Sequence, residues 1–137
     1  MKDNQLKKNL SEKIDFVKEF HEIFKIGSRE KPAAAIETKE YELRHRLLQE
    51  ENEEYLEACK NGDLVEIADA LGDQLYIVFG TILKHGLQDK MDEIFEEIHR
   101  SNMSKLDEKG QPIFREDGKI MKGNNYFKPN IKKVLEK

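Results

Sequence analysis

Two segments with helical spacing carry carboxylates at positions where a soluble helix normally places core residues. In residues 43–56, the apolar arc of the helix also contains Glu51 and Glu54, given a turn of about 100° per residue. In residues 66–76, a helix would present apolar side chains on nearly all of its circumference except for one acidic stripe. The stripe holds Glu66, Asp69 and Asp73. An ionised carboxylate in a dry interior is very unfavourable unless it is paired or bound to a cation, so these segments predict a metal site between two helices.

Magnesium is the cation that this pattern favours, and Mn²⁺ is the alternative. Hard cations such as Mg²⁺ prefer oxygen ligands, usually a few carboxylates together with waters and substrate phosphates. Glu51 and Glu54 project from neighbouring points of one helix face. Asp69 and Asp73 lie one turn apart on the other helix. Glu50 lies at the edge of the first face, where the roles of ligand and of base are both open to it.

Glu66 has two interpretations that the sequence leaves open. It follows Asp63 by three residues, which is the spacing of a capping box, and its side chain would then satisfy the N-terminus of the helix. In the other interpretation, its place on the acidic stripe makes it a metal ligand.

Other reactive side chains carry no comparable pattern. The residues that zinc prefers lack paired spacing, so a zinc site is not expected. These residues are His45, His85, His99 and Cys59. Ser101 and Ser104 lack the neighbours of a catalytic nucleophile, and we expect them to be polar residues at a helix C-terminus.

Composition excludes several classes of function. Lysine and arginine number 24 against 28 aspartates and glutamates, and the net charge of −4 gives no reason to expect a basic face for nucleic acid. The single cysteine fits a reducing compartment. No apolar run approaches the roughly 20 residues that span a bilayer, and the first residues lack a signal peptide's apolar stretch. We therefore expect a cytoplasmic protein of one domain, residues 1–137, without a membrane partner.

Helical spacing and capping residues predict an all-α fold, a bundle of four to five helices. The helices are expected at residues 11–26, 38–60, 64–85, 89–104 and 131–135. Residues 112–121 resemble a small hairpin with an Asp-Gly turn, and residues 122–129 are expected to form a loop. The third helix is apolar over more of its surface than one small domain covers, which favours a homodimer or a dimer of dimers with this helix near the interface.

At the acidic residues, the chain resembles the all-α nucleoside triphosphate pyrophosphohydrolases, the MazG-like superfamily that includes dimeric dUTPases and phosphoribosyl-ATP pyrophosphohydrolase. The family pattern is Glu-Glu-x-x-Glu followed by Glu-x-x-Asp, and residues 50–54 match its first half. The second half has two alignments. Residues 66–69 fit it literally, whereas Leu71-Gly72-Asp73 resembles the family's Leu-Gly-Asp segment. In the second alignment Ala70 stands where a glutamate is expected, and Asp69 or Glu66 would substitute from the same face.

The resemblance also implies roles for residues after the acidic helices. Residues 99–105 resemble the segment that completes the site in the single-domain branch, where Asn102 and Lys105 are implied to contact metal-bound phosphates. Arg100 would neutralise remaining phosphate charge. In the tail, Lys122 is implied to contact a phosphate and Tyr126 to stack on a base. A surface loop with a core aromatic is the alternative for these last two residues.

The reaction implied by the resemblance is hydrolysis between the α- and β-phosphates of a nucleoside triphosphate, which yields a monophosphate and pyrophosphate. Two or more Mg²⁺ ions would be held by Glu51, Glu54, Asp69 and Asp73, and Glu50 would act as the base that orients a water. Two alternatives remain open at this point. One is phosphoribosyl-ATP pyrophosphohydrolase, and the other is a helical oligomer that binds nucleotide or metal without turnover.

Overall fold

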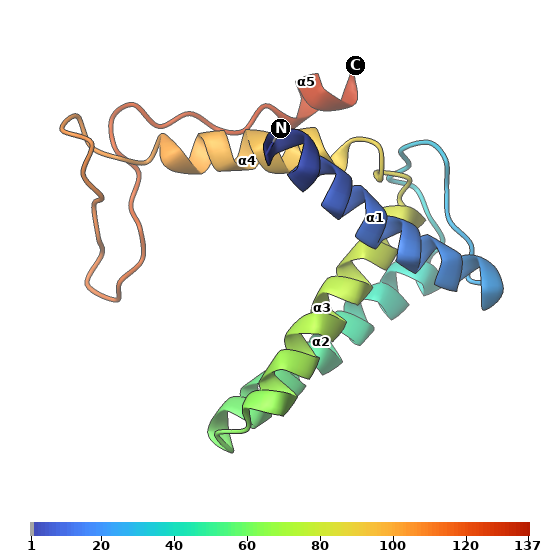
Figure 1. Ribbon diagram of the computed structural model, residues 1–137. Coiled ribbons are helices and arrows are strands. Elements are labelled where there is room, and N and C mark those ends of the chain that lie inside the picture. Colours follow the sequence, from blue (N-terminus) through green and yellow to red (C-terminus); the bar gives the residue numbers. More distant parts are fainter. Residues whose placement is uncertain (1) are drawn as a thin grey trace. The chain divides into compact units, whose positions relative to one another are not determined.

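All the named secondary-structure elements of the described residues are helices, joined by loops. The computed structural model describes residues 2–137, with side chains from residue 10 onward (Figure 1). Its helices are α1 (Lys2–Ile23), α2 (Thr38–Lys60), α3 (Leu64–Lys84), α4 (Met91–Met103) and α5 (Ile131–Leu135). Residues 2–137 contain no named strand, so the predicted all-α class is confirmed. None of the helices in this range is both long enough and apolar enough to span a bilayer.

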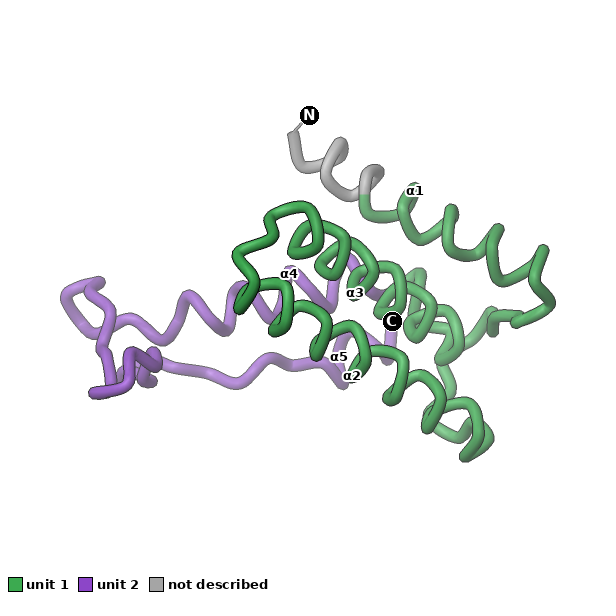
Figure 2. Tube along the Cα trace, turned by 90° about the horizontal axis from the view of Figure 1, so that it is seen from below, with its two compact units in different colours: residues 1–89 green, residues 90–137 purple. Residues whose placement is uncertain are grey.

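The chain divides into two compact units, residues 1–89 and residues 90–137 (Figure 2). The first contains α1, α2 and α3, and the second contains α4, the following loops and α5. The expectation of one domain over residues 1–137 stays a prediction.

Helices α2 and α3 form an antiparallel pair in the first unit (Figure 1). Their bounds agree with the predicted ones because capping residues set them. Asp63 begins α3 by accepting a hydrogen bond from the backbone N–H of Glu66 at 3.1 Å. Ala58 of α2 and Ala70 of α3 are 5 % and 2 % exposed, so small side chains let the two backbones approach each other.

Arg44 fixes the register of this pair from within the interface. Its side chain, only 9 % exposed, donates from Nε to Thr81 Oγ1 at 3.1 Å and from Nη2 to the Ile77 carbonyl at 2.9 Å. Gly80 leaves the room that this requires, because a Cβ there would lie 2.5 Å from Arg44 Nη2 and 2.8 Å from His21 Nε2. Burial, with Arg44 and Lys84 nearby, lowers the pKa of His21.

Helix α1 packs on α3 through an apolar cluster. Ile14 and Val17 of α1 contact Leu83 of α3, and all three are at most 3 % exposed. The predicted start of this helix at Ser11 was wrong, since α1 already begins at Lys2. The preceding residues contain no Pro or Gly to stop a helix, and Lys and Leu among them favour one, so the cap-forming residue Ser11 does not mark the start.

The second unit confirms the predicted hairpin in a minimal form. Phe114 and Ile120 make a single antiparallel bridge. Hydrogen bonds on either side of it run from Arg115 N to Lys119 O at 2.8 Å and from Met121 N to Ile113 O at 2.7 Å. No third strand supports the pair among the described residues, and two short strands alone are marginally stable. Elsewhere in this unit, Ile94 of α4 and Val134 of α5 are buried.

The loop between α1 and α2 is tied to the end of α3 by one carboxylate. Glu40 accepts hydrogen bonds from Arg29 Nη2 at 2.9 Å and from the backbone N–H of Glu37 at 3.3 Å, and it lies 3.0 Å from Lys84 Nζ. Lys84 is nearly buried, and its amino group also donates to the Ile26 carbonyl at 2.8 Å. Hydrogen bonds from Arg29 and Lys84 lower the pKa of Glu40 to about 2.

We expect Glu40→Gln to lower the free energy of unfolding by about 1–2 kcal/mol at pH 7, since Lys84 would lose its carboxylate partner. A depressed carboxyl pKa gives stability that is present above pH 4.5 and is lost as the pH falls towards 2. The difference from wild type in urea unfolding should therefore be smaller at pH 3 than at pH 7. Glu42→Gln, at an exposed position of the same helix, is the control. Equal stability of both variants at pH 7 would contradict the assignment.

Candidate metal centre

Three of the predicted acidic residues meet where α2 faces α3. Glu51 and Glu54 come from α2 and Asp73 from α3. Each offers one carboxylate oxygen, and these three oxygens lie within 4.8 Å of one another. The helical pitch places the two glutamates one turn apart, and the antiparallel register set by Arg44 brings Asp73 opposite them. We call Glu51, Glu54 and Asp73 the acidic cluster.

The acidic cluster is electrostatically strained without a cation. Burial raises the pKa of Glu51 to about 7, with further increases from Glu54, Asp73 and Asp69. Burial, followed by Asp69 and Glu54, also raises the pKa of Asp73. Glu51 Oε2 is buried and has no hydrogen-bond partner. Among the ion pairs of residues 10–137, none involves a residue of the cluster.

These observations fit a hard divalent cation. The donor set consists of carboxylate oxygens alone, which suits Mg²⁺ or Mn²⁺ and does not suit zinc. The buried oxygen of Glu51 lacks a partner of the kind that a cation would supply. The three residues that would hold the ion are those of the acidic cluster.

The other acids on α3 lie outside the acidic cluster. Asp69 is exposed and acts on it at longer range, through the repulsion that raises the pKa values of Glu51 and Asp73. Glu66 is exposed, and its backbone N–H donates to the Asp63 cap. Ala70, the position where the family pattern expects a glutamate, is buried. The ligand roles of Asp69 and Glu66 therefore stay predictions, as does the role of Glu50 as base.

Glu50 precedes Glu51 on α2 and is exposed. Glu50 is not among the three residues of the acidic cluster.

The five predicted substrate residues all belong to the second unit, residues 90–137. They are Asn102, Lys105, Arg100, Lys122 and Tyr126. Asn102 is exposed at the end of α4, and the backbone of Lys105 accepts a hydrogen bond from Gly123 N at 3.0 Å. Lys122 Nζ lies 4.8 Å from the centre of the Tyr126 ring.

Arg100 makes contacts that the sequence did not indicate. It forms an ion pair with Glu97 at 2.9 Å, and its guanidinium lies 4.5 Å from the centre of the Phe127 ring. Only the i, i+3 spacing of Glu97 and Arg100 gave a signal for this pair. Ser101 and Ser104 bind the backbone of Phe127, which agrees with their expected structural role.

We expect Glu51→Gln to stabilise the metal-free protein at pH 8. A carboxyl pKa raised to about 7 makes the folded state less stable as the pH rises from 4.5 through 7, because the folded protein must give up a proton that it holds more tightly. After allowance for screening, the gain in unfolding free energy should be about 1 kcal/mol at pH 8 and absent at pH 4. Thermal unfolding in the presence of a chelator measures it.

Glu53→Gln, on the exposed side of the same helix, is the matched control and should change little at either pH. A Glu51→Gln variant that is less stable than wild type at pH 8 without metal would show that the carboxylate is not strained.

Comparison with known proteins agrees with this geometry. The family model described as phosphoribosyl-ATP pyrophosphohydrolase matches residues 17–102, which is more than half of the chain and includes the whole acidic cluster. The loops after α4, with Lys122 and Tyr126, lie outside the matched range. No curated protein matches the sequence. The chain belongs to the phosphoribosyl-ATP pyrophosphohydrolase family, and thus to the MazG-like superfamily of all-α nucleoside triphosphate pyrophosphohydrolases.

Proposed function

We propose that this protein hydrolyses nucleoside or deoxynucleoside triphosphates between the α- and β-phosphates in a Mg²⁺-dependent reaction. The products would be a nucleoside monophosphate and pyrophosphate, and the role would be removal of unwanted nucleotides from the pool. The observation that carries the proposal is the acidic cluster, three carboxylates within 4.8 Å on two facing helices of a pyrophosphohydrolase family.

In this proposal the four acidic residues have two roles. Glu51, Glu54 and Asp73 would hold the metal, and the metal would supply positive charge against the phosphates and would favour loss of a proton from water. Glu50, exposed and next to Glu51, takes the proton from the water that attacks the α-phosphorus. The proton moves to the Glu50 carboxylate while the bond from the α-phosphorus to the bridging oxygen breaks and pyrophosphate leaves.

The family match favours one specific alternative substrate, phosphoribosyl-ATP. It contains the same triphosphate, so the same acidic residues would serve, but it also carries a second phosphoribosyl group. That group would require further basic side chains, and the sequence shows no dense basic cluster. We therefore place simple nucleoside triphosphates first.

The buried alanine at position 70 keeps a non-catalytic binding function as a third hypothesis. One acidic ligand fewer than in the family pattern weakens the hold on a second metal ion, and two-metal sites need carboxylates on both ions. Turnover distinguishes this hypothesis from the enzyme.

We also propose that the protein is a homodimer or a dimer of dimers. Helices α1 and α2 leave six large apolar side chains of α3 between 37 % and 76 % exposed. These are Leu64, Val65, Leu71, Leu75, Tyr76 and Val78. An apolar pocket of about 380 Å³, with Leu48 and Ile82 in its lining, lies between α2 and α3. Apolar surface of this extent on one small unit is typical of an interface between subunits.

Purified protein should release pyrophosphate and monophosphate in equal amounts from at least one nucleoside triphosphate, and only with Mg²⁺ or Mn²⁺. The Glu51→Gln and Asp73→Asn variants should each lose activity by a factor of roughly 100 or more, since each removes a ligand of the metal, while their circular dichroism stays that of a folded helical protein. The nucleotides tested as substrates should include phosphoribosyl-ATP.

Glu53→Gln is the control for this assay, because it removes a glutamate of the same helix outside the acidic cluster. Full activity in either cluster variant would refute the metal assignment, and turnover of phosphoribosyl-ATP alone would replace the proposed substrate.

Replacing Leu71 and Leu75 together by glutamate should lower the molar mass measured by light scattering towards that of one chain, because charge would be buried at the proposed interface. Lys39→Glu, at an exposed position of α2, introduces the same side chain and should leave the mass unchanged. A wild-type protein that is monomeric at micromolar concentration would refute the oligomer.

A further inference from the structure

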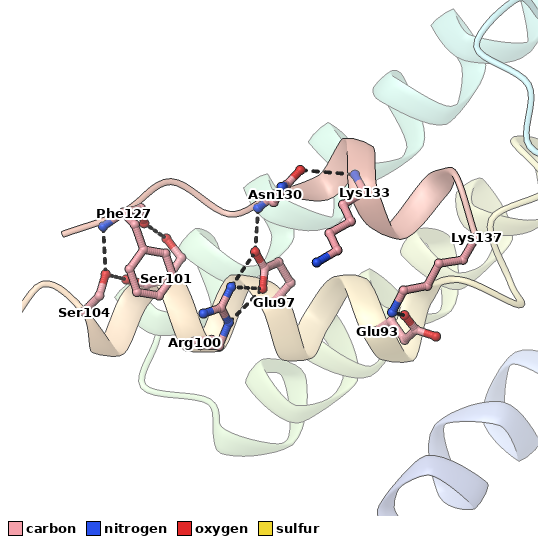
Figure 3. A network of polar contacts seen from close by, with 9 residues as sticks. All are labelled: Glu93, Glu97, Arg100, Ser101, Ser104, Phe127, Asn130, Lys133 and Lys137. Carbon is pink, nitrogen blue, oxygen red and sulfur yellow. Dashed lines mark hydrogen bonds and ion pairs between the residues drawn. The ribbon is translucent and has the colours of Figure 1, made fainter.

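The chain after the hairpin lies along α4 in the second unit and is bound there through its backbone (Figure 3). Ser101 Oγ donates to the Phe127 carbonyl at 2.8 Å, and Ser104 Oγ accepts from the Phe127 N–H at 3.1 Å. One turn earlier on α4, Glu97 accepts from the Asn130 N–H at 2.6 Å. Positions 97, 101 and 104 share one face of the helix, so a single polar face satisfies the backbone of residues 127–130.

Arg100 contacts both Glu97 and the ring of Phe127. Its Nε and Nη2 donate to the two carboxylate oxygens of Glu97 at 2.9 and 3.2 Å, while its Cζ atom lies 4.5 Å from the centre of the Phe127 ring (Figure 3). The Glu97 side chain is 11 % exposed, and hydrogen bonds from Asn130 and Arg100 lower its pKa. Paired donors on a carboxylate and a guanidinium placed over an aromatic ring both restrict the geometry of the side chain.

The same segment includes Lys122 and Tyr126, the two tail residues for which the family resemblance implies contacts with the substrate. Tyr126 directly precedes Phe127, and its N–H donates to the Gly123 carbonyl at 3.2 Å. Gly123 in turn donates to the Lys105 carbonyl, and a Cβ on Gly123 would lie 2.3 Å from the Leu106 carbonyl oxygen. Lys122, next to Gly123, carries its amino group 4.8 Å from the Tyr126 ring. This segment is therefore bonded at one end to Lys105, just after α4, and at the other end to Glu97, within α4.

We propose that Glu97, Arg100 and Phe127 form a latch that positions Lys122 and Tyr126 for the nucleotide, and that Arg100 is a positioning residue. This inference rests on the proposed function and on the predicted contacts of Lys122 with phosphate and of Tyr126 with the base. It gives Arg100 a role other than the expected neutralisation of phosphate charge, because its Nε and Nη2 bond Glu97 and its guanidinium carbon lies 4.5 Å from the centre of the Phe127 ring.

A latch would matter for substrate binding because a long stretch of chain separates α4 from the bound segment. More than 20 residues separate Ser104 from Phe127, and they contain no helix and only one isolated bridge. Ordering such a loop at the moment of binding costs conformational entropy. A latch made in the free protein removes this cost beforehand, so its loss should weaken substrate binding and leave the chemical step unchanged.

The test compares Arg100→Ala with Phe127→Ala, because phenylalanine cannot bind phosphate. If both act through the latch, each should raise KM about 5- to 10-fold with kcat within about twofold, and the double variant should be no worse than the poorer single one. Phe127→Tyr keeps an aromatic ring under Arg100 and should restore most of the affinity. Lys132→Ala, an exposed lysine of α5, is the control.

Two kinetic results would overturn the proposal. One is a loss of kcat in Arg100→Ala with no effect of Phe127→Ala, which would make Arg100 a direct phosphate ligand. The other is unchanged kinetics in both variants.

A second measurement does not depend on activity. Amide hydrogen exchange at Phe127 and Asn130 should become at least tenfold faster in Arg100→Ala than in wild type, and unchanged exchange would refute the latch. Absence of turnover in the wild-type protein would refute the proposed function, and the exchange rates would then decide whether the latch itself exists.

Discussion

The buried contact of Arg44 with α3 determines how the acidic residues can meet. Its guanidinium bonds Thr81 and the Ile77 carbonyl, and the absence of a side chain at Gly80 gives it room. Two antiparallel helices can slide past each other by one turn, about 5.4 Å, without losing their apolar contact. A buried cation with directed hydrogen bonds prevents that shift. Such a shift would separate Glu51 from Asp73, so the geometry of the acidic cluster depends on a residue that is not part of it.

The acidic cluster lowers the stability of the metal-free fold and, by the same repulsion, would favour the binding of a cation. Glu51 and Asp73 are partly buried, and the repulsion among the carboxylates of the cluster weakens the metal-free fold. The same carboxylates would bind a cation more strongly because few other groups neutralise them. Elsewhere the first unit compensates with paired charges, as Glu40 does with Arg29 and Lys84. Near the N-terminus of α2, Glu40 is thus paired with positive charges, whereas further along the same helix the acidic cluster has no such partners among residues 10–137.

The helix bounds and the residues that share a helix face could be predicted from helical pitch and capping residues. The rotation of each helix about its own axis, which decides which face meets a neighbour, could not. The bounds of α2 and the Asp63 cap follow from local rules, and so does the pairing of Glu51 with Glu54. The choice between Asp73 and its neighbour Asp69 depends on how α3 is turned against α2, which tertiary packing at Ala70 decides. The contacts of Phe127 could not be predicted, because they involve backbone groups of a segment without periodicity.

The single bridge of the hairpin has a consequence for variation in chain length. Between residues 24 and 37 the chain is bonded to α3 and to the residues after it at several points, so an inserted residue would displace buried partners. The turn at Asp117 and Gly118 is exposed, and it is connected to its surroundings through one isolated bridge. That turn is the place in the second unit where a reporter group or an extra segment can be introduced with least disturbance, and where natural length differences are best tolerated.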